Sequence, residues 1–370
     1  MVRLTRAQQQ ARTRAAVLAA AVAEFTEHGF AAAKVDRIAA RAELTRGAVY
    51  SNFPSKRSLY LAVLLDSVER EAASGASPAG SAQPLDLPDG AEAFARAWLE
   101  RLPLAGDTPD AGKVRSRSLT GVFEDDPGRT AMAGLARLDG LLVALALESC
   151  RAPRPGRRVR LAELVLTLLH GAGHLAETAP GFGDPFDVAR ACRQLADHAA
   201  DDAWDPPHLP YVAAPSLCRD PWTPPGELTD ALTGQAVGFG DDGVIVVLGT
   251  NRLGAAEEAV RAARPGEAVT VAVVTDDPAE IGALVRLRIT DLAACLRRAF
   301  GSDAGLPLRL VLDDGAALAT AVGAGMAADT ESAVRVQDGT ITARATGRGA
   351  AYAVATAPSL TERRTGSDEA

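Results

Sequence analysis

The chain has 370 residues, enough for two or three domains, and 47% of them are hydrophobic but only 4% aromatic. We therefore expect packed cores built mainly from small aliphatic side chains, which excludes wholesale disorder. The net charge is −8, yet residues 1–60 hold ten Lys and Arg against four Asp and Glu, a local charge of +6. Binding to nucleic acid is not expected of the acidic remainder, so any such binding is predicted for the first 60 residues.

The four cysteines, at positions 150, 192, 218 and 295, form no CxxC pair. This excludes a zinc ribbon and a dithiol redox motif, and so few cysteines in a long chain are typical of a reducing compartment. No apolar run approaches the roughly 18 residues of a membrane span, and the first 14 residues are polar and basic. We expect a cytoplasmic protein without a membrane segment.

The first 73 residues predict four helices. The first covers residues 3–28 and ends at Gly29, which tolerates a left-handed backbone. A short helix is expected over residues 35–42. Thr45 is the predicted N-cap of a third helix, which runs through Phe53 and ends at Pro54. The fourth helix covers residues 55–73.

A Pro- and Gly-rich loop is predicted over residues 74–90, and helices are predicted near 91–103, 113–124, 128–150, 158–177 and 185–203. Seven prolines between residues 205 and 225 indicate a stiff linker. Strands over 244–248, 268–274 and 308–312 then alternate with helices over 253–264 and 278–300. Asp338-Gly339 is typical of a hairpin between 333–336 and 340–345. This order indicates an α/β layer, and residues 359–370 are expected to be a disordered tail.

Two short helices joined by a tight turn are a common way to place a helix in the DNA major groove. The third predicted helix carries base-reading candidates in Arg46, Ser51 and Asn52, while Thr45, Tyr50 and Lys56 are suited to phosphates. Gly47 would let the helix start approach the duplex closely. On pattern alone, a helical hairpin with a solvated basic face remains the alternative.

The stretch from Arg12 to Val63 resembles the TetR family of bacterial transcription regulators. The resemblance is carried by Phe25 with Gly29-Phe30, by Ile38-Ala39, by the run from Thr45 to Tyr50, and by the run from Asn52 to Lys56. It implies that residues 1–58 form a helix-turn-helix domain with the third helix as recognition helix. It also implies that Lys56 meets a phosphate and that Thr13 touches the DNA backbone. One departure is Lys34, which replaces the usual hydroxyl cap and would offer a cation to a phosphate.

The resemblance further implies that residues 59–204 form a helical ligand-binding and dimerisation domain. Its last two helices, near 158–177 and 185–203, would pair with a second copy as a four-helix bundle. The ligand-pocket candidates are apolar or aromatic side chains with a few polar groups that would orient the ligand: Phe94, Trp98, Arg117, Phe123, Leu138, Asp139 and Leu142. For each of them, plain core packing is the alternative.

His170 and His174 lie four residues apart on one predicted helix face, with Glu177 one turn further. This spacing suits a divalent metal, but a lone pair of histidines is weak evidence for one. We therefore add His170 and His174 to the ligand-pocket candidates, with an interface role as the alternative, and predict no metal or other cofactor. Cys150 and Cys192 would sense oxidants only if they were exposed and had lowered pKa values. Burial as small hydrophobic side chains is the alternative.

Residues 228–358 resemble thioredoxin-like domains, after a linker over 205–227. The resemblance is carried by Leu232 to Gln235, by 307–323 and by 334–347. Two departures concern the chemistry: the turn at Gly249 to Leu253 has no cysteine, and the family's proline near Thr330 is missing. Without a thiolate there is no nucleophile for disulfide exchange, so we expect no catalytic residue and no enzyme here. A different small α/β domain is the alternative.

Together these features predict a multidomain protein, with an all-α TetR-like N-terminal part and a C-terminal α/β domain of thioredoxin-like type. The predicted function is a dimeric repressor that binds a palindromic DNA operator and is released by a small-molecule effector. The alternatives are a redox-sensing regulator that uses its cysteines, a thiol oxidoreductase with a DNA-binding head, and a tail that recruits a protein partner.

Overall fold

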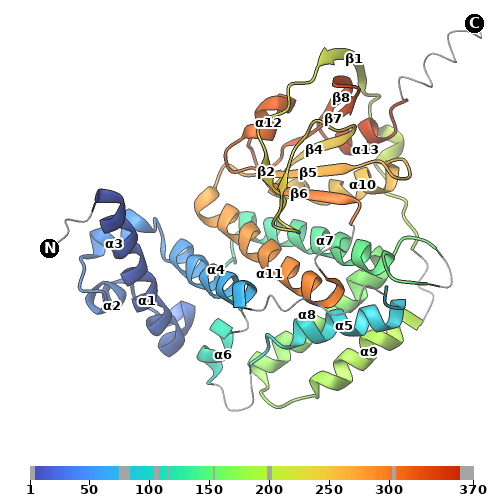
Figure 1. Ribbon diagram of the computed structural model, residues 1–370. Helices are drawn as coiled ribbons and strands as arrows, with labels where there is room; N and C mark the ends of the chain where they lie inside the picture. Colours follow the sequence, from blue (N-terminus) through green and yellow to red (C-terminus); the bar gives the residue numbers. More distant parts are fainter. Residues whose placement is uncertain are drawn as a thin grey trace, which may run out of the picture.

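The computed structural model describes residues 5–74, 84–103, 108–115, 117–152, 155–197, 202–301 and 306–358. Helices occupy the N-terminal half of the chain, and a six-stranded mixed sheet with its own helices occupies the C-terminal half (Figure 1). The centre of the predicted loop over 74–90 and the predicted tail over 359–370 lie outside the described residues.

The head consists of α1 (Arg6–Ala32), α2 (Val35–Arg41) and α3 (Arg46–Asn52). A capping box starts α1, because the Thr5 side chain accepts from the Gln8 N–H and the Gln8 side chain accepts from Thr5. Gly29 has a φ of 64°, so the predicted helix break is present, although one more turn follows it. Phe25, Ile38 and Val49, one from each helix, are buried in the head. One long helix and two short helices thus pack around a common apolar centre.

The helical body contains α4 (Lys56–Ser74), α5 (Leu87–Leu99), α6 (Pro109–Arg115), α7 (Asp126–Glu148), α8 (Val159–Thr178) and α9 (Pro185–Asp197). The prediction of a helix over 113–124 is wrong in its extent, because Arg117 and Gly121 have positive φ values of 58° and 74° and turn the chain. Within the described residues, α7 is the one helix long and apolar enough to cross a membrane, and 72% of its apolar window is buried inside the protein.

The predicted linker is partly structured. It holds a short turn, η1 (Leu209–Tyr211), and an edge strand, β1 (Ser216–Pro221), which pairs antiparallel with the strand at Thr340–Thr346. Proline is compatible with such an edge strand, since its outer side needs no backbone donor. The stiff linker expected over 205–225 therefore contains a strand of the sheet at Ser216–Pro221.

The remaining elements follow the predicted order closely. They are β2 (Leu228–Thr229), β3 (Ala236–Val237), β4 (Gly243–Gly249), η2 (Thr250–Arg252), α10 (Ala255–Ala262), β5 (Val269–Val274), η3 (Pro278–Gly282), α11 (Ala283–Phe300), β6 (Leu308–Leu312), α12 (Ala317–Val322), β7 (Glu331–Gln337), β8 (Thr340–Thr346) and α13 (Ala350–Ala355). The sheet order is β1-β8-β7-β4-β5-β6, with β4, β5 and β6 parallel and β7 antiparallel to β4. The hairpin at Asp338-Gly339 is present, and the thioredoxin-like resemblance stays a prediction.

Helix α11 joins the two halves of the molecule. It lies between the sheet and the helical body and packs on α4, α5 and α7 (Figure 1). One face of the sheet, including Val246 and Val271, belongs to the same buried apolar cluster as the helices of the body. The other face is covered by α12 and by Trp222. The C-terminal module is therefore packed against the body rather than hanging from its linker.

Candidate DNA-binding head and interdomain cavity

The predicted recognition helix α3 has its start fixed and its polar face open. The Thr45 hydroxyl accepts from the Ala48 N–H at 3.2 Å, which confirms the predicted N-cap. The Arg46 side chain is 61% exposed, lies 3.6 Å from Asp36 and has its guanidinium over the Tyr50 ring. Tyr50 is itself exposed. Both side chains are thus available to a partner outside the protein.

The C-terminal end of α3 makes more contacts within the protein than its N-terminal half does. The Ser51 hydroxyl and the Asn52 amide both donate to the Ala48 carbonyl at 2.9 Å. Arg14 from α1 donates to the Asn52 carbonyl, and its guanidinium lies over the Phe53 ring. Gly47 is exposed, with only the Thr45 hydroxyl near the position a Cβ would take. These contacts orient α3 on α1 and leave its N-terminal half open.

The start of α2 has no side-chain cap, as the residue at Lys34 predicted. A buried carboxylate from α1 replaces it, because Glu24 Oε1 accepts from the Lys34 N–H at 2.9 Å and from Arg37 Nε at 2.7 Å. Burial raises the pKa of Glu24, but the hydrogen bonds from Arg37 and the Lys34 backbone outweigh it, so that the pKa lies below its ordinary value. The Lys34 side chain itself is exposed.

Lys56 is engaged within the protein. Its ammonium donates to the carbonyls of Phe30, Ala31 and Ala33 and lies 4.6 Å from the centre of the Phe30 ring. Partial burial lowers the pKa of Lys56. It therefore closes the end of α1 in this conformation, whereas its predicted phosphate contact stays a prediction. Thr13 is half-buried on α1.

Five of the predicted ligand-pocket residues meet at one cavity of about 330 Å³ between the helical body and α11: Trp98, Arg117, Phe123, His170 and His174. Three others, Phe94, Leu138 and Leu142, are fully buried among the core side chains and do not line it. Asp139 is buried beside the cavity and pairs with Arg288 of α11.

Sequence reasoning missed the side chains that α11 and the end of α5 contribute, which are Arg101, Leu287, Arg288 and Asp291. Arg101 and Arg117 both pair with Asp291, and Arg101 stacks on the Trp98 ring with its guanidinium 3.7 Å from the ring centre. Local sequence does not reveal that Asp291 pairs with Arg101 and Arg117, because more than a hundred residues separate them along the chain. The charged residues Arg286, Arg288 and Asp291 within α11 show only that this helix carries polar groups.

Among the described residues, no third metal ligand joins His170 and His174, whose spacing on α8 suits a metal ion. Within the described residues, no group of three or more His, Cys, Asp or Glu side chains could hold a metal ion. His170 Nδ1 lies 2.7 Å from the Leu166 carbonyl, so Nδ1 carries the proton and Nε2 faces Arg288. Desolvation and the Arg288 guanidinium lower the pKa of His170 to about 4. His170 is thus a neutral wall of the cavity.

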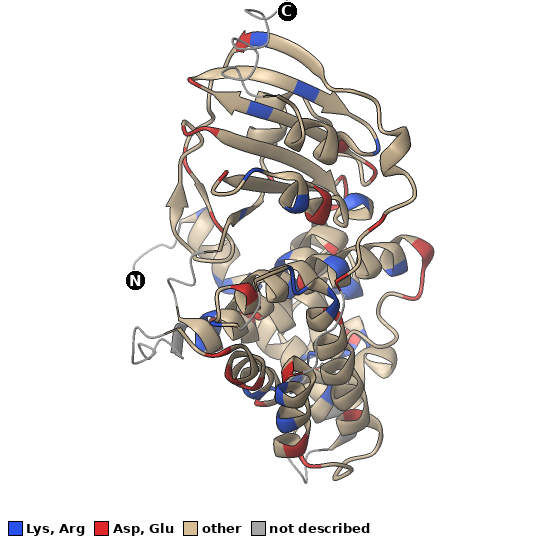
Figure 2. Cartoon of the chain, turned by 90° about the vertical axis from the view of Figure 1, so that its right-hand side faces the viewer, with Lys and Arg blue, Asp and Glu red and all other residues tan. Residues whose placement is uncertain are grey.

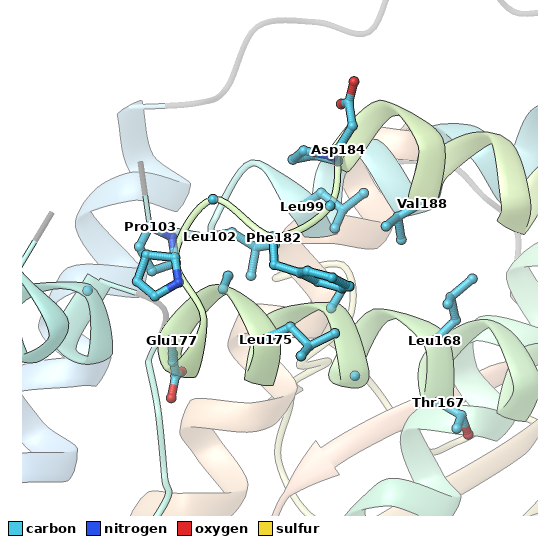
Figure 3. Close-up of a pocket in the computed structure, with 18 of the residues that line it drawn as sticks. Leu99, Leu102, Pro103, Thr167, Leu168, Leu175, Glu177, Phe182, Asp184 and Val188 are labelled. Carbon is cyan, nitrogen blue, oxygen red and sulfur yellow. The ribbon is translucent and has the colours of Figure 1, made fainter. Parts of the chain in front are cut away.

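A second cavity, of about 530 Å³, lies where α8 meets α9 and is mostly apolar. Leu99 and Leu102 contribute to it from the end of α5, Leu175 from α8 and Val188 from α9. Phe182, in the connection between α8 and α9, points toward Leu175 (Figure 3). The adjoining surface exposes further apolar side chains, including Leu164 and Phe186.

The cysteines lack the features of reactive thiols. Burial raises the pKa values of Cys150, Cys192 and Cys295 to about 11. The Cys218 thiol is half-buried and contacts the Ile341 carbonyl. Reactive cysteines instead have lowered pKa values and open surroundings, so these geometries give the redox alternatives no support.

The C-terminal module also reaches the start of α4, where the head joins the body. Glu280 of η3 accepts from the Ser55 hydroxyl and pairs with Arg57 at 2.9 Å. Arg57 in turn binds Asp125 of the body at 2.7 Å and lies over the Phe123 ring. Both basic and acidic residues occur near the boundary between the helices and the α/β layer (Figure 2). One arginine therefore links the head, the body and the module.

The arrangement of α1, α2 and α3, with an exposed third helix that has an N-cap, is that of a helix-turn-helix protein. Residues 17–63 match the family model described as bacterial regulatory proteins, tetR family. A curated relative, a helix-turn-helix transcriptional repressor of Streptomyces coelicolor, is 44% identical over 52 residues, which are 14% of this chain and 27% of the relative. Residues 17–63 are therefore similar to the DNA-binding segment of TetR-family transcriptional regulators.

Two solved structures of transcriptional regulators also match part of the chain. A TetR regulator from Rhodococcus is 21% identical with a TM-score of 0.31, and the match covers 51% of this chain and 95% of the other. A transcriptional regulator from Streptomyces coelicolor is 24% identical with a TM-score of 0.27, covering 50% and 97%. The curated relative is spanned over only about a quarter of its length.

Proposed function

We propose that this protein is a transcriptional repressor that binds a palindromic DNA operator as a homodimer and is released by a small-molecule effector. The observation that carries this proposal is the open N-terminal half of α3, where Arg46 and Tyr50 are exposed next to the capped helix start. An arginine at this place suits a guanine edge, and Tyr50 suits a phosphate.

The homodimer is supported by the apolar surface on α8 and α9. Around the turn between α8 and α9, Leu175 is 38% exposed, Phe182 69% and Phe186 66%, while Cys192 and Ala189 of α9 pack inward. Large apolar side chains that lie together on a surface are typical of protein interfaces. Two heads held by such an interface would meet half-sites about one helical turn apart.

The effector is supported by the cavity beside α11, in which Arg117 pairs with Glu71 of α4. The route to the head is supported by Arg57 and Glu280. A ligand acts only through its different affinities for the DNA-binding and the released conformations. Helix α4 connects the head to the body, so a shift of α4 would change the spacing of two recognition helices. The reactive-thiol route is not proposed, because burial raises the pKa values of three of the cysteines.

The test is selection of bound DNA from a random pool by the full-length protein, followed by affinity measurements on the enriched site. We expect a near-palindrome whose affinity falls steeply with salt. Arg46→Ala and Tyr50→Ala should each weaken binding by about ten- to a hundredfold, corresponding to roughly 1–3 kcal/mol. Arg70→Ala, an exposed arginine on α4 that pairs with Asp66, is the control and should bind as the wild type does. Unchanged affinity in both head variants would contradict the proposal.

A further inference from the structure

The cavity between the body and α11 has two unlike walls. Apolar side chains form one wall: Trp98, Leu119, Phe123, Met132, Leu169 and Leu287. The other wall is polar and holds three guanidinium groups, from Arg101, Arg117 and Arg288. The carboxylates of Asp291 and Glu177 and the rings of His170 and His174 also line the cavity. The volume of about 330 Å³ is at the lower end of the roughly 300–1,000 Å³ of small-molecule sites. The cavity is thus large enough for a compact organic molecule with one polar end.

Two arginines of the polar wall have a buried N–H group without an acceptor among the described residues. The Arg117 side chain is only 6% exposed, and its buried Nε–H has no hydrogen-bond acceptor among the described residues. The nearest carboxylate oxygen, Asp291 Oδ1, lies 3.6 Å away, beyond hydrogen-bond distance. The Nε–H of Arg288 is likewise buried without an acceptor in the described part of the chain. Buried donors without partners are costly, so an additional acceptor in the cavity would stabilise the protein.

The existing carboxylates do not fill this need. Asp139 pairs with Arg288, and Asp291 is shared between Arg101 and Arg117. Glu71 of α4 accepts from Nη2 of Arg117. The Nε–H groups of Arg117 and Arg288 have no acceptor among these or the other described residues. The neutral His170 offers one acceptor nitrogen, to Arg288. A planar carboxylate would match the forked geometry of a guanidinium and could accept two parallel hydrogen bonds.

From this geometry we propose that the cavity binds a small organic acid, with its carboxylate on Arg117 and Arg288 and its apolar body against Trp98 and Phe123. The inference rests on the proposed function and names the chemical class of its effector. The site is composite, because α5, α8 and the turn at Arg117 supply one part of it and α11 of the C-terminal module supplies the other. The C-terminal module is then part of the effector site.

The same helix connects the site to the head. A ligand carboxylate on Arg117 competes with Asp291, which lies on α11. Helix α11 begins directly after η3, whose Glu280 holds Ser55 and Arg57 at the start of α4. Displacement of Asp291 would shift α11, and because η3 and α11 are continuous, the shift would change the contacts of Glu280 with α4.

The experiment measures binding to the full-length protein without DNA, by calorimetry and by the shift in unfolding temperature. The probes are phenylacetate and octanoate, and the matched neutral probes are phenylacetamide and octanamide. We expect at least one carboxylate to bind and to stabilise the protein, with its amide weaker by about tenfold or more, since a charge-assisted hydrogen bond is lost. Equal binding of acids and amides, or no binding by either acid, would overturn the proposal.

Three variants sharpen the result. Arg117→Gln should lower the carboxylate affinity by about tenfold or more, whereas Asp291→Asn, which removes the competing charge, should raise it several-fold. Arg96→Gln is the control, because Arg96 lies on α5 but is exposed and pairs with Glu92. An opposite response of the two cavity variants supports the site even if one of them is less stable. Equal effects of Arg117→Gln and Arg96→Gln would overturn it.

A final arm separates this inference from the proposed function. The bound carboxylate is added to the complex with the selected DNA site. Release of DNA by the acid, and not by its amide, supports the coupling through α11. Carboxylate binding by a protein that selects no DNA would contradict the repressor while supporting the site, and selection of DNA without carboxylate binding would do the reverse.

Discussion

Glu24 shows how one buried side chain fixes the geometry of the head. Its carboxylate is fully buried and holds the start of α2 through the Lys34 N–H and Arg37. The neighbouring contacts of His28 and Arg41 are longer or exposed. The cap that α2 lacks in its own sequence is thus supplied from α1, and the loss of this carboxylate would leave two donors without their acceptor.

Glu24→Gln should lower the free energy of unfolding at pH 7 by roughly 1–3 kcal/mol, as expected for hydrogen bonds to a charged group. Because the folded-state pKa of Glu24 lies below its ordinary value of 4.5, its contribution is complete above that value and is lost as the pH falls through the folded-state pKa. The difference between the wild type and the variant should therefore shrink below about pH 4.5. Chemical denaturation at pH 7 and pH 4 measures both values.

The control for this prediction is Glu27→Gln. Glu27 is half-exposed and pairs with Arg41, so its replacement should change the stability little at either pH. Equal stability of both variants at pH 7 would show that the Glu24 carboxylate does not stabilise the start of α2.

At the level of whole elements, α7 and η2 determine how closely the body and the C-terminal module approach. Gly134 of α7 lies so near the module that a Cβ would be 2.5 Å from the Thr250 carbonyl oxygen. Gly140, two turns further along α7, would meet only the Glu163 side chain at 3.4 Å. Both glycines are buried in the same helix, so they form a matched pair.

Gly140→Ala should stabilise the protein by up to about 1 kcal/mol, because alanine favours the helix. Gly134→Ala should instead destabilise it by roughly 1–3 kcal/mol, since the added methyl group meets a backbone atom that cannot rotate away. Unfolding in urea distinguishes the two. A stabilising Gly134→Ala would show that α7 and η2 lie further apart than described.

The junction of α4 with η3 is the second contact between elements that matters for regulation. Arg57 and Glu280 are both about three-quarters buried, and Arg57 also binds Asp125. Such a pair contributes more than an exposed one, because solvent screens it less.

A double-mutant cycle with Arg57→Gln and Glu280→Gln should give a coupling free energy of roughly 0.5–2 kcal/mol. The exposed pair of Asp66 and Arg70 on α4 is the reference, with about 0.3–0.5 kcal/mol expected. Unfolding in denaturant supplies all the values. Strict additivity at Arg57 and Glu280 would remove the proposed link between the module and α4.

For the molecule as a whole, the two halves share one apolar core. Side chains of α4, α5 and α7 pack on α11, and the sheet face behind α11 continues the same cluster. Removing the module would expose this surface to water at a cost of roughly 25 cal/mol for each Å².

A fragment of residues 1–204 should therefore lose the cooperative unfolding of the full chain and tend to aggregate, although it contains every residue of the predicted regulator. Thermal unfolding followed by circular dichroism and sedimentation of both proteins measure this. A monodisperse fragment that unfolds as sharply as the full chain would show that the halves fold independently.

Much of this protein could be predicted from local pattern. The helix start at Thr45, the helix break at Gly29, the hairpin turn at Gly339 and the strand runs depend on neighbours within a few residues. Propensity and capping act over that range, and the family motif is equally local. Five of the nine pocket candidates line one cavity, and their binding of a ligand stays a prediction.

The partners of those candidates depended on the fold. Arg288 meets Asp139, and Asp291 meets Arg101 and Arg117, although each pair is separated by more than 140 residues along the chain. The packing of α11 into the body follows from long-range burial of apolar surface, which has no preferred sequence separation and leaves no periodic mark. Local sequence thus determined most of the elements and the head, whereas tertiary packing brought α11 to the helices and created the cavity between them.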